Sequence, residues 1–356
     1  MHKILTIVGA RPQFIKAAAI SHVISEKYPK DISEDILHTG QHYDEAMSGR
    51  FFTELDIPLP KYNLGVGSGS HGKQTGLMMS GIEEILMDNH YDGVLVYGDT
   101  NSTLSGALAA SKLHVPVYHV EAGLRSFNRN MPEEINRIVA DHVSTLLFAP
   151  TKTAVQNLWN EGFTEESVVF SGDVMYDNVH HYSAKLPTPD TQHSTYVLAT
   201  LHRDFNTDNP ERLKTILSAL NDITEQFNTD IMLPLHPRTR KCIDSMNFIF
   251  NSDRIHTVAP LSYLETLGAL RQCILVLTDS GGLQKEAAFS GKCCVVLRPE
   301  TEWVELVENG AAILADADKE KILGATAKLI GKTPKTPTQF GDGHAAEIIL
   351  KKVISQ

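Results

Sequence analysis

The sequence of 356 residues lacks long apolar runs and carries fewer basic than acidic side chains. A membrane-spanning helix needs about 20 mostly apolar residues, so the chain is not expected to cross a membrane. Its 32 Lys and Arg stand against 43 Asp and Glu, which gives a formal net charge of −11. Because nucleic-acid phosphates are bound by clustered cations, this balance argues against a nucleic-acid partner. An anionic small substrate needs only a few converging cations and stays possible.

Cysteine is scarce: the chain has four, Cys242, Cys273, Cys293 and Cys294. Their spacing is not that of metal ligands, so they are interpreted as reduced core residues. The first residues lead directly into a β-type run, without room for the basic segment and cleavage site of an export signal. A cytoplasmic location is therefore expected.

Several catalytic signatures are also missing. Despite sixteen histidines there is no H-E-x-x-H or C-x-x-C pattern, so no metal site is expected. No strand-to-helix turn carries Gly-x-Ser-x-Gly, which argues against a Ser-His-Asp hydrolase. Gly9, after the first β-type run, has no partner glycines, and this excludes an NAD-dependent 4-epimerase. The G-x-G-x-x-G at 67–72 follows no convincing strand and is interpreted as a mobile loop.

What the sequence does contain is an alternation of β-type runs with amphipathic helical stretches, such as 15–24 and 100–113. The length favours two domains, and the polar stretch 183–194, which carries two prolines, is the best linker. We expect domains at 1–182 and 195–342, with a last helix at 343–356 packing back on the first. The predicted class is α/β, with two Rossmann-like, doubly wound domains facing a central cleft. Strands are expected at 4–8, 35–38, 93–97, 115–120, 146–149, 196–200, 230–235, 274–278 and 293–297.

Charged side chains follow the strands of the first half. Arg11 and Lys16 lie at the start of a helix, where free N–H groups and the helix dipole favour an anion such as phosphate. Asp99 and Glu121 each follow a strand, and Glu133 lies at another helix start. Three converging carboxylates can divide proton transfer and cation stabilisation between them. The plainer alternatives are a helix N-cap for Asp99 and solvated positions for Arg11 and Lys16.

The second half repeats this pattern. The strongest signal is the small-residue turn 279–282, where glycines let the backbone approach a phosphate and a serine can donate a hydrogen bond. Glu286, further along the same helix, is in reach of a ribose hydroxyl pair. The candidates for binding a phosphorylated ligand here are His202, Arg203, His236, Ser280, Gly281, Gly282 and Glu286.

In order along the chain, these motifs resemble those of the non-hydrolysing UDP-N-acetylglucosamine 2-epimerase family. The matching motifs lie at 9–12, 41–42, 98–100, 120–125, 132–137, 279–282 and 301–302. Segments 10–16, 202–208, 235–241 and 298–306 look most like the branch that converts UDP-2,3-diacetamido-2,3-dideoxy-glucuronic acid to the mannuronic acid epimer for surface polysaccharide. The resemblance implies a glycosyltransferase-B-like fold, a homodimer, a UDP-activated amino sugar or aminouronate as substrate, and no cofactor.

The resemblance also implies residue roles. Catalysis falls to Asp99, Glu121 and Glu133, with His202 stabilising the departing diphosphate. Tyr43-Asp44 replaces the usual basic residue after Gln41-His42, which puts activation by a second UDP-sugar in doubt. The residues expected to bind the UDP-sugar are Arg11, Lys16, Gln41, His42, Arg137, Arg203, His236, Ser280, Gly281, Gly282, Glu286 and Arg298. Candidate partners of a uronate carboxylate are Arg125, Arg129, Arg137 and Arg238.

Other functions remain open at this stage. The first alternative is a UDP-N-acetylglucosamine 2-epimerase that produces UDP-N-acetylmannosamine. A retaining glycosyltransferase of the same fold would share the nucleotide-binding half but would need an acceptor. A hydrolysing epimerase would release UDP, and a non-catalytic sensor would have no use for three acids at strand or helix ends.

Overall fold

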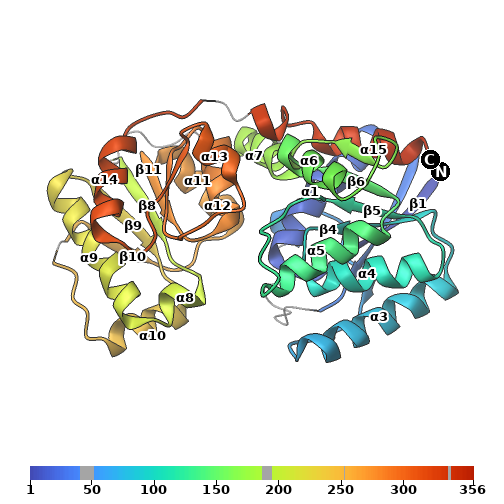
Figure 1. The fold of residues 1–356 in the computed structure, drawn as a ribbon, viewed down its shortest axis with the longest axis horizontal. Helices are drawn as coiled ribbons and strands as arrows, with labels where there is room; N and C mark the ends of the chain where they lie inside the picture. The colour runs from blue at the N-terminus through green and yellow to red at the C-terminus, as the bar shows by residue number, and fades with distance from the viewer. Residues whose placement is uncertain (41–51, 187–194, 252, 336–337) are drawn as a thin grey trace. The chain divides into compact units, whose positions relative to one another are not determined.

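The computed structural model describes residues 1–40, 52–186, 195–251, 253–335 and 338–356, and the described chain divides into two compact units (Figure 1). Unit 1 comprises Met1–Asn178 together with Thr338–Gln356, and unit 2 comprises Val179–Pro337. The end of the chain therefore belongs to the first unit. The expected limits of 1–182 and 195–342 stay a prediction about which segments fold on their own.

Unit 1 is built on a parallel sheet whose strands are rich in Ile, Leu and Val. Its strands are β1 (His2–Val8), β2 (Ile32–His38), β3 (Tyr62–Asn63), β4 (Gly93–Tyr97), β5 (Val117–Val120), β6 (Leu146–Ala149) and β7 (Val168–Phe170). Among the described residues they form one seven-stranded sheet in the order β3-β2-β1-β4-β5-β6-β7, with every pair parallel. The side chains of β4, β5 and β6 are all buried, as expected for a sheet covered on both faces.

Helices cover both faces of this sheet. The described helices of unit 1 include α1 (Arg11–Lys27), α3 (His71–Asp88), α4 (Asn101–Lys112), α5 (Pro132–Val143), α6 (Lys152–Asn160) and α15 (Ala345–Ile354), which follows a 3-10 turn at Thr338–Phe340. The helices α3, α4 and α5 pack side by side, and α15 packs against α1 (Figure 1). The helix α7 (Val174–Lys185) begins in unit 1 and ends in unit 2.

Unit 2 repeats the design. Its strands are β8 (Tyr196–Thr200), β9 (Asp230–Pro234), β10 (Ile255–Val258), β11 (Leu275–Thr278), β12 (Cys294–Val296) and β13 (Ala312–Leu314). In the described part of the chain they pair in parallel in the order β10-β9-β8-β11-β12-β13. The helices are α8 (Asp204–Thr207), α9 (Pro210–Gln226), α10 (Pro237–Ser245), α11 (Tyr263–Gln272), α12 (Gly281–Phe289), α13 (Val304–Glu308) and α14 (Lys319–Leu329).

Both strand orders are those of a doubly wound Rossmann fold, which confirms the predicted α/β class. The direction of winding reverses between β1 and β4 in unit 1 and between β8 and β11 in unit 2. Ligands of such sheets bind where strands end at this reversal. The ends of these strands are therefore where a site is sought in each unit.

Two expectations from the sequence need correction or comment. The glycine-rich stretch 67–72 is not loop throughout, because α3 begins at His71 and includes Gly72.

Of the cysteines, Cys273, Cys293 and Cys294 are buried and Cys242 is half-buried, and all are free. Burial raises the pKa of the Cys273 thiol to about 12, so this thiol is inert. No helix in the described ranges has the length and apolar character needed to cross a membrane.

Candidate active site

The first turn of unit 1, between β1 and α1, is organised by the buried side chain of Gln13. Its Oε1 accepts hydrogen bonds from the N–H groups of Gly9 at 2.9 Å and Ala10 at 3.2 Å. Its Nε2 donates to the carbonyl oxygen of Tyr97 at 2.9 Å, at the end of β4. Gln13 thus occupies the N–H groups of Gly9 and Ala10, which precede α1. The anion site expected at the start of α1 stays a prediction, and Arg11 lies half-buried at the first position of this helix.

Lys16 and Glu121 form an ion pair at the ends of the central strands. The Nζ of Lys16 lies 2.7 Å from Oε1 of Glu121, and the two side chains are 11% and 9% exposed. A Cβ on Gly98 would lie 3.0 Å from Nζ of Lys16, so all three residues meet. Glu121 has a φ of 70°, which is rare outside glycine. Such strain of about 1–3 kcal/mol is typical of functional positions held by the surrounding structure.

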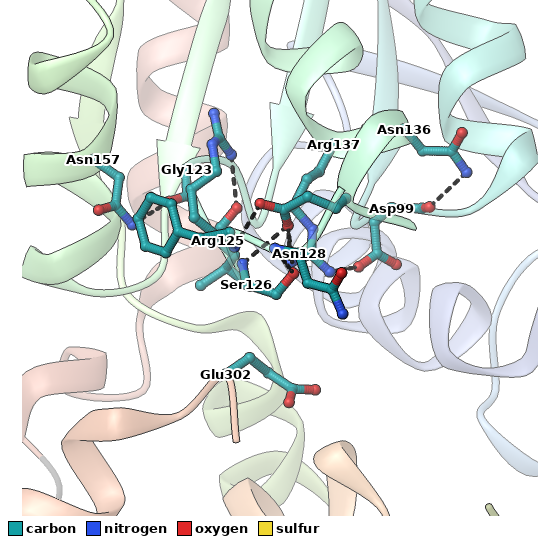
Figure 2. A network of polar contacts seen from close by, with 12 residues as sticks. Asp99, Gly123, Arg125, Ser126, Asn128, Asn136, Arg137, Asn157 and Glu302 are labelled. Atoms are coloured by element: carbon teal, nitrogen blue, oxygen red, sulfur yellow. Dashed lines mark hydrogen bonds and ion pairs between the residues drawn. The ribbon is translucent and has the colours of Figure 1, made fainter. Parts of the chain in front are cut away.

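Asp99 lies after β4 and forms an ion pair with Arg137 of α5 (Figure 2). The same guanidinium reaches Oε2 of Glu134 at 3.0 Å. Glu134 also accepts hydrogen bonds from the N–H groups of Ser126 and Phe127, both at 2.9 Å. Arg137, predicted to contact the substrate, therefore binds two acids. One is Asp99, a candidate catalytic acid, and the other is Glu134, which holds the loop at Ser126 and Phe127. No pattern in the sequence predicts this role of Glu134.

The neighbouring acid Glu133 is exposed on the first turn of α5. It shares the helix with Glu134 and Arg137, but no contact of its side chain with Asp99 or Glu121 is observed among the described residues. The structure thus brings Asp99 and Glu121 to the ends of adjacent strands and places Glu133 on the exposed side of α5.

Arg125 is wrong as a partner for a uronate carboxylate. Its side chain is 1% exposed, and its guanidinium lies 2.8 Å from Asp141 and 2.7 Å from Glu161. Two carboxylates therefore already neutralise it inside the unit. Arg238 is similar on the surface of unit 2, where it lies 2.7 Å from Asp204 and 2.6 Å from Asp208. Arg129 is exposed in the loop before α5.

In unit 2, the buried carboxylate of Asp279 holds the loop that follows β8. Its Oδ1 accepts from the N–H of His202 at 2.9 Å, and its Oδ2 accepts from the N–H of Arg203 at 3.1 Å. The amide of Asn206 donates to the same Oδ2 at 3.1 Å. Asp279, which directly follows β11, thus fixes the backbone of the loop after β8, while the side chains of His202 and Arg203 stay exposed.

The two glycines of the turn into α12 have different surroundings. Ser280 caps the helix, with its Oγ accepting from Leu283 N at 3.5 Å. A Cβ on Gly281 would lie 2.6 Å from Oε1 of Glu302, whereas nothing lies within 4 Å of one on Gly282. Gly281 is therefore buried against the side chain of Glu302, whereas Gly282 is exposed with open space beside it. Glu286 is buried one turn further on.

The segment after β12 packs against this turn. Arg298 is buried, and its guanidinium lies 3.0 Å from Glu302. The ammonium of Lys285 lies 3.9 Å from the ring centroid of Trp303, a cation–π contact. Arg298 thus supports the Ser280 turn through Glu302. The sequence pattern does not predict that Glu302 and Trp303 belong to this cluster, although both lie in the segment 298–306 that resembles the family.

The remaining candidates are peripheral or undescribed. His236 is an exposed N-cap of α10, and its Nδ1 accepts from Arg238 N at 3.3 Å. Gln41 and His42 lie outside the described residues. In the ranges that the structure covers, no three His, Cys, Asp or Glu side chains gather closely enough to hold a metal ion.

Comparison with known proteins identifies the family of the chain. A family model described as UDP-N-acetylglucosamine 2-epimerase matches residues 26–354. The UDP-2,3-diacetamido-2,3-dideoxy-D-glucuronate 2-epimerase of Pseudomonas aeruginosa is 50% identical over 355 residues, 98% of this chain and 98% of the relative.

Solved structures of similar fold include members of the same family. The crystal structure of Methanocaldococcus jannaschii UDP-GlcNAc 2-epimerase in complex with UDP-GlcNAc and UDP has a TM-score of 0.87 at 41% identity, covering 100% of this chain and 99% of the other. A lipopolysaccharide outer core galactosyltransferase, at a TM-score of 0.60 and 13% identity over 100% of this chain and 99% of its own, shares the fold alone. The fold is thus glycosyltransferase-B-like, and the chain belongs to the UDP-N-acetylglucosamine 2-epimerase family.

Proposed function

We propose that this protein is an isomerase that inverts C2 of UDP-2,3-diacetamido-2,3-dideoxy-glucuronic acid and gives the mannuronic acid epimer for surface polysaccharide synthesis. The observation that carries the proposal is the 50% identity, over 98% of both chains, to the Pseudomonas aeruginosa enzyme with that substrate in its name. We further propose that the protein works as a homodimer in the cytoplasm and needs no cofactor.

The chemistry explains why carboxylates and cations are both needed. The C2 proton of such a sugar is next to an amide nitrogen and not to a carbonyl, so it is weakly acidic. If the bond between C1 and the UDP oxygen breaks first, its electron pair leaves with UDP and positive charge develops on the sugar ring. A carboxylate then removes the C2 proton, and a C1–C2 double bond forms, which gives a glycal. Addition of UDP to C1 and of a proton to the opposite face of C2 inverts that centre.

Unit 1 supplies the acids for this scheme. Asp99 and Glu121 follow adjacent parallel strands, β4 and β5, and each has a basic partner. Their negative charge stabilises the ring cation, and either can take the C2 proton. Glu133, exposed on α5, is the third acid in the proposal. Glu121, paired with Lys16, is also an acid–base group that can take up and release a proton during turnover.

Unit 2 supplies groups for the departing UDP. The exposed His202 and Arg203 follow β8 on a loop fixed by Asp279, and the open side of Gly282 lies at the start of α12. Cations and a helix start together stabilise a developing diphosphate. We propose that Ser280 and Glu286 bind the phosphates and ribose and that Arg11 and Lys16 of unit 1 bind the same ligand.

The test is turnover in deuterium oxide, followed by proton NMR. With the diacetamido-glucuronate substrate, we expect the mannuronic epimer to carry deuterium at C2, and we expect no accumulation of free UDP. The same incubation with UDP-N-acetylglucosamine separates the two substrates, because conversion of that sugar alone would contradict the branch assignment. Stoichiometric release of UDP and free sugar would instead identify a hydrolysing epimerase.

A further inference from the structure

His119 is a fully buried histidine in β5 with a hydrogen-bond acceptor at each ring nitrogen. Its Nδ1 lies 2.7 Å from Oδ1 of Asp141 in α5, and its Nε2 lies 2.7 Å from the carbonyl oxygen of Gly98. A neutral imidazole has one N–H and one lone pair, so it can donate to only one of these oxygens. Both short contacts are satisfied only if the ring carries a proton on each nitrogen or if Asp141 is protonated.

The surroundings of Asp141 decide between these two states. Its Oδ2 lies 2.8 Å from the guanidinium of Arg125 and accepts from the N–H of Gly123 at 3.1 Å. A guanidinium and a backbone N–H are both donors, so this geometry stabilises the ionised carboxylate of Asp141. Asp141 is therefore the carboxylate, and the second proton belongs to the imidazole of His119.

The charges around the ring also balance. The positive side chains of His119 and Arg125 face the negative side chains of Asp141 and Glu161, with Arg125 bridging the two acids. A buried charge is tolerated when it is paired and hydrogen-bonded in this way. A charged histidine is thus compatible with the interior of unit 1.

The same ring joins the elements that carry the proposed acids. Gly98 directly precedes Asp99 and has a φ of 63°. Its N–H donates to Val120 O at 3.0 Å, so β5 holds both sides of this turn, through the N–H and through the carbonyl bound by His119. Glu121 follows β5 two residues after His119, and Asp141 lies on α5 with Glu133.

From this geometry we infer that His119 is held as an imidazolium and acts as a positioning residue that fixes the Gly98–Asp99 turn relative to Glu121. The effect on turnover rests on the proposed epimerase function, whereas the charge state of the ring does not. His119 would not touch the substrate. Its contribution is to keep two acids from separate strands at a fixed spacing, because misplacement of such groups lowers rate steeply.

Two substitutions separate the two hydrogen bonds. In His119→Asn the side-chain amide replaces Nδ1 and keeps the bond to Asp141 but loses the bond to Gly98. In His119→Gln the amide reaches the position of Nε2 and keeps the bond to Gly98. We expect the Asn variant to lose about tenfold or more in kcat, with KM and the Kd of UDP changed less than about threefold, and the Gln variant to retain clearly more activity.

The control is Ile349→Ala on α15, a buried residue outside this network. It should lower Tm, as a cavity in the core does, while kcat stays near that of the wild type. A kcat for the Asn variant equal to that of this control, or equal losses in the Asn and Gln variants, would overturn the positioning role.

The charge state is read directly from the wild-type protein. With 15N-labelled histidine, we expect the ring of His119, assigned by its absence in His119→Gln, to show a directly bonded proton on both nitrogens. One protonated and one bare nitrogen would overturn the inference, whatever the activity. If the wild-type protein converts neither UDP-sugar, the proposed function fails, and this spectrum still decides the state of His119.

Discussion

Asp99 and Glu121 each face a basic side chain contributed by another segment of the chain, Arg137 and Lys16. The sequence placed the acids at strand ends, because β-type runs stop just before them. It did not predict the pairs, since Lys16 and Glu121 are far apart along the chain and their spacing carries no information about contact. The role of Gln13 was equally hidden, because an amide inside a helix has no distinctive pattern.

The pairing of Glu121 leads to a testable expectation. Replacing it in Glu121→Gln keeps the volume and removes the charge, so turnover should fall by about 10² or more while the Kd of UDP changes little. Asp99→Asn should behave in the same way. Steady-state kinetics together with calorimetry of UDP binding checks both. Glu165→Gln, the same chemical change on an exposed acid, is the control; near-normal turnover in both site variants would contradict their proposed catalytic role.

At the scale of elements, the central strands were the predictable part. The expected 93–97, 146–149 and 196–200 coincide with β4, β6 and β8. The strands β3, β7, β10 and β13 were missed, because each has only two to four residues and lies at an edge of its described sheet. The alternation of strands and helices along the chain predicts a parallel, doubly wound sheet. The length of an edge strand instead depends on contacts with residues far away in the sequence, which a local pattern does not show.

The helix α15 docks on unit 1 through a buried acid. Asp177 of α7 accepts hydrogen bonds from the N–H groups of Ala345 at 3.0 Å and Ala346 at 2.7 Å. Burial raises the pKa of Asp177 to about 6 from 3.8, and its hydrogen bonds to α15 only partly oppose this. The folded state therefore holds this proton more tightly than the unfolded chain does.

The sign of the pH effect follows. Between about pH 4 and 6 the folded protein binds more protons at Asp177, so its contribution to the free energy of unfolding falls as the pH rises through this window. A shift of about two pH units corresponds to at most about 3 kcal/mol. Urea unfolding across this range should show a steeper decline in the wild type than in Asp177→Asn. Parallel curves for the two proteins would show that this carboxyl does not titrate there.

On the scale of the whole molecule, unit 1 is discontinuous, because Thr338–Gln356 completes it. The apolar residues Ala346, Ile349, Leu350 and Val353 of α15 are buried. Ending the chain after Pro337 would expose the surface they cover, and burial of such side chains contributes about 1.5–3 kcal/mol each for the larger ones.

We therefore expect the truncated chain to lose stability in unit 1 more than in unit 2. Hydrogen exchange should rise first in α1, which packs against α15, while the strands of unit 2 keep their protection. A chain lacking only Ser355 and Gln356, which are exposed, is the control and should exchange like the full protein. Uniform exchange in both units would argue that they unfold together.

The discontinuity of unit 1 also sets an order of events during translation. The strands of unit 1 leave the ribosome first, but α15 leaves it only after the strands of unit 2. Domains fold as their chains emerge, so unit 2 has all its segments available before unit 1 does. Until α15 emerges, the face of α1 that it covers lacks its partner. Nascent chains stalled before α15 are thus where chaperone dependence of this protein would be greatest.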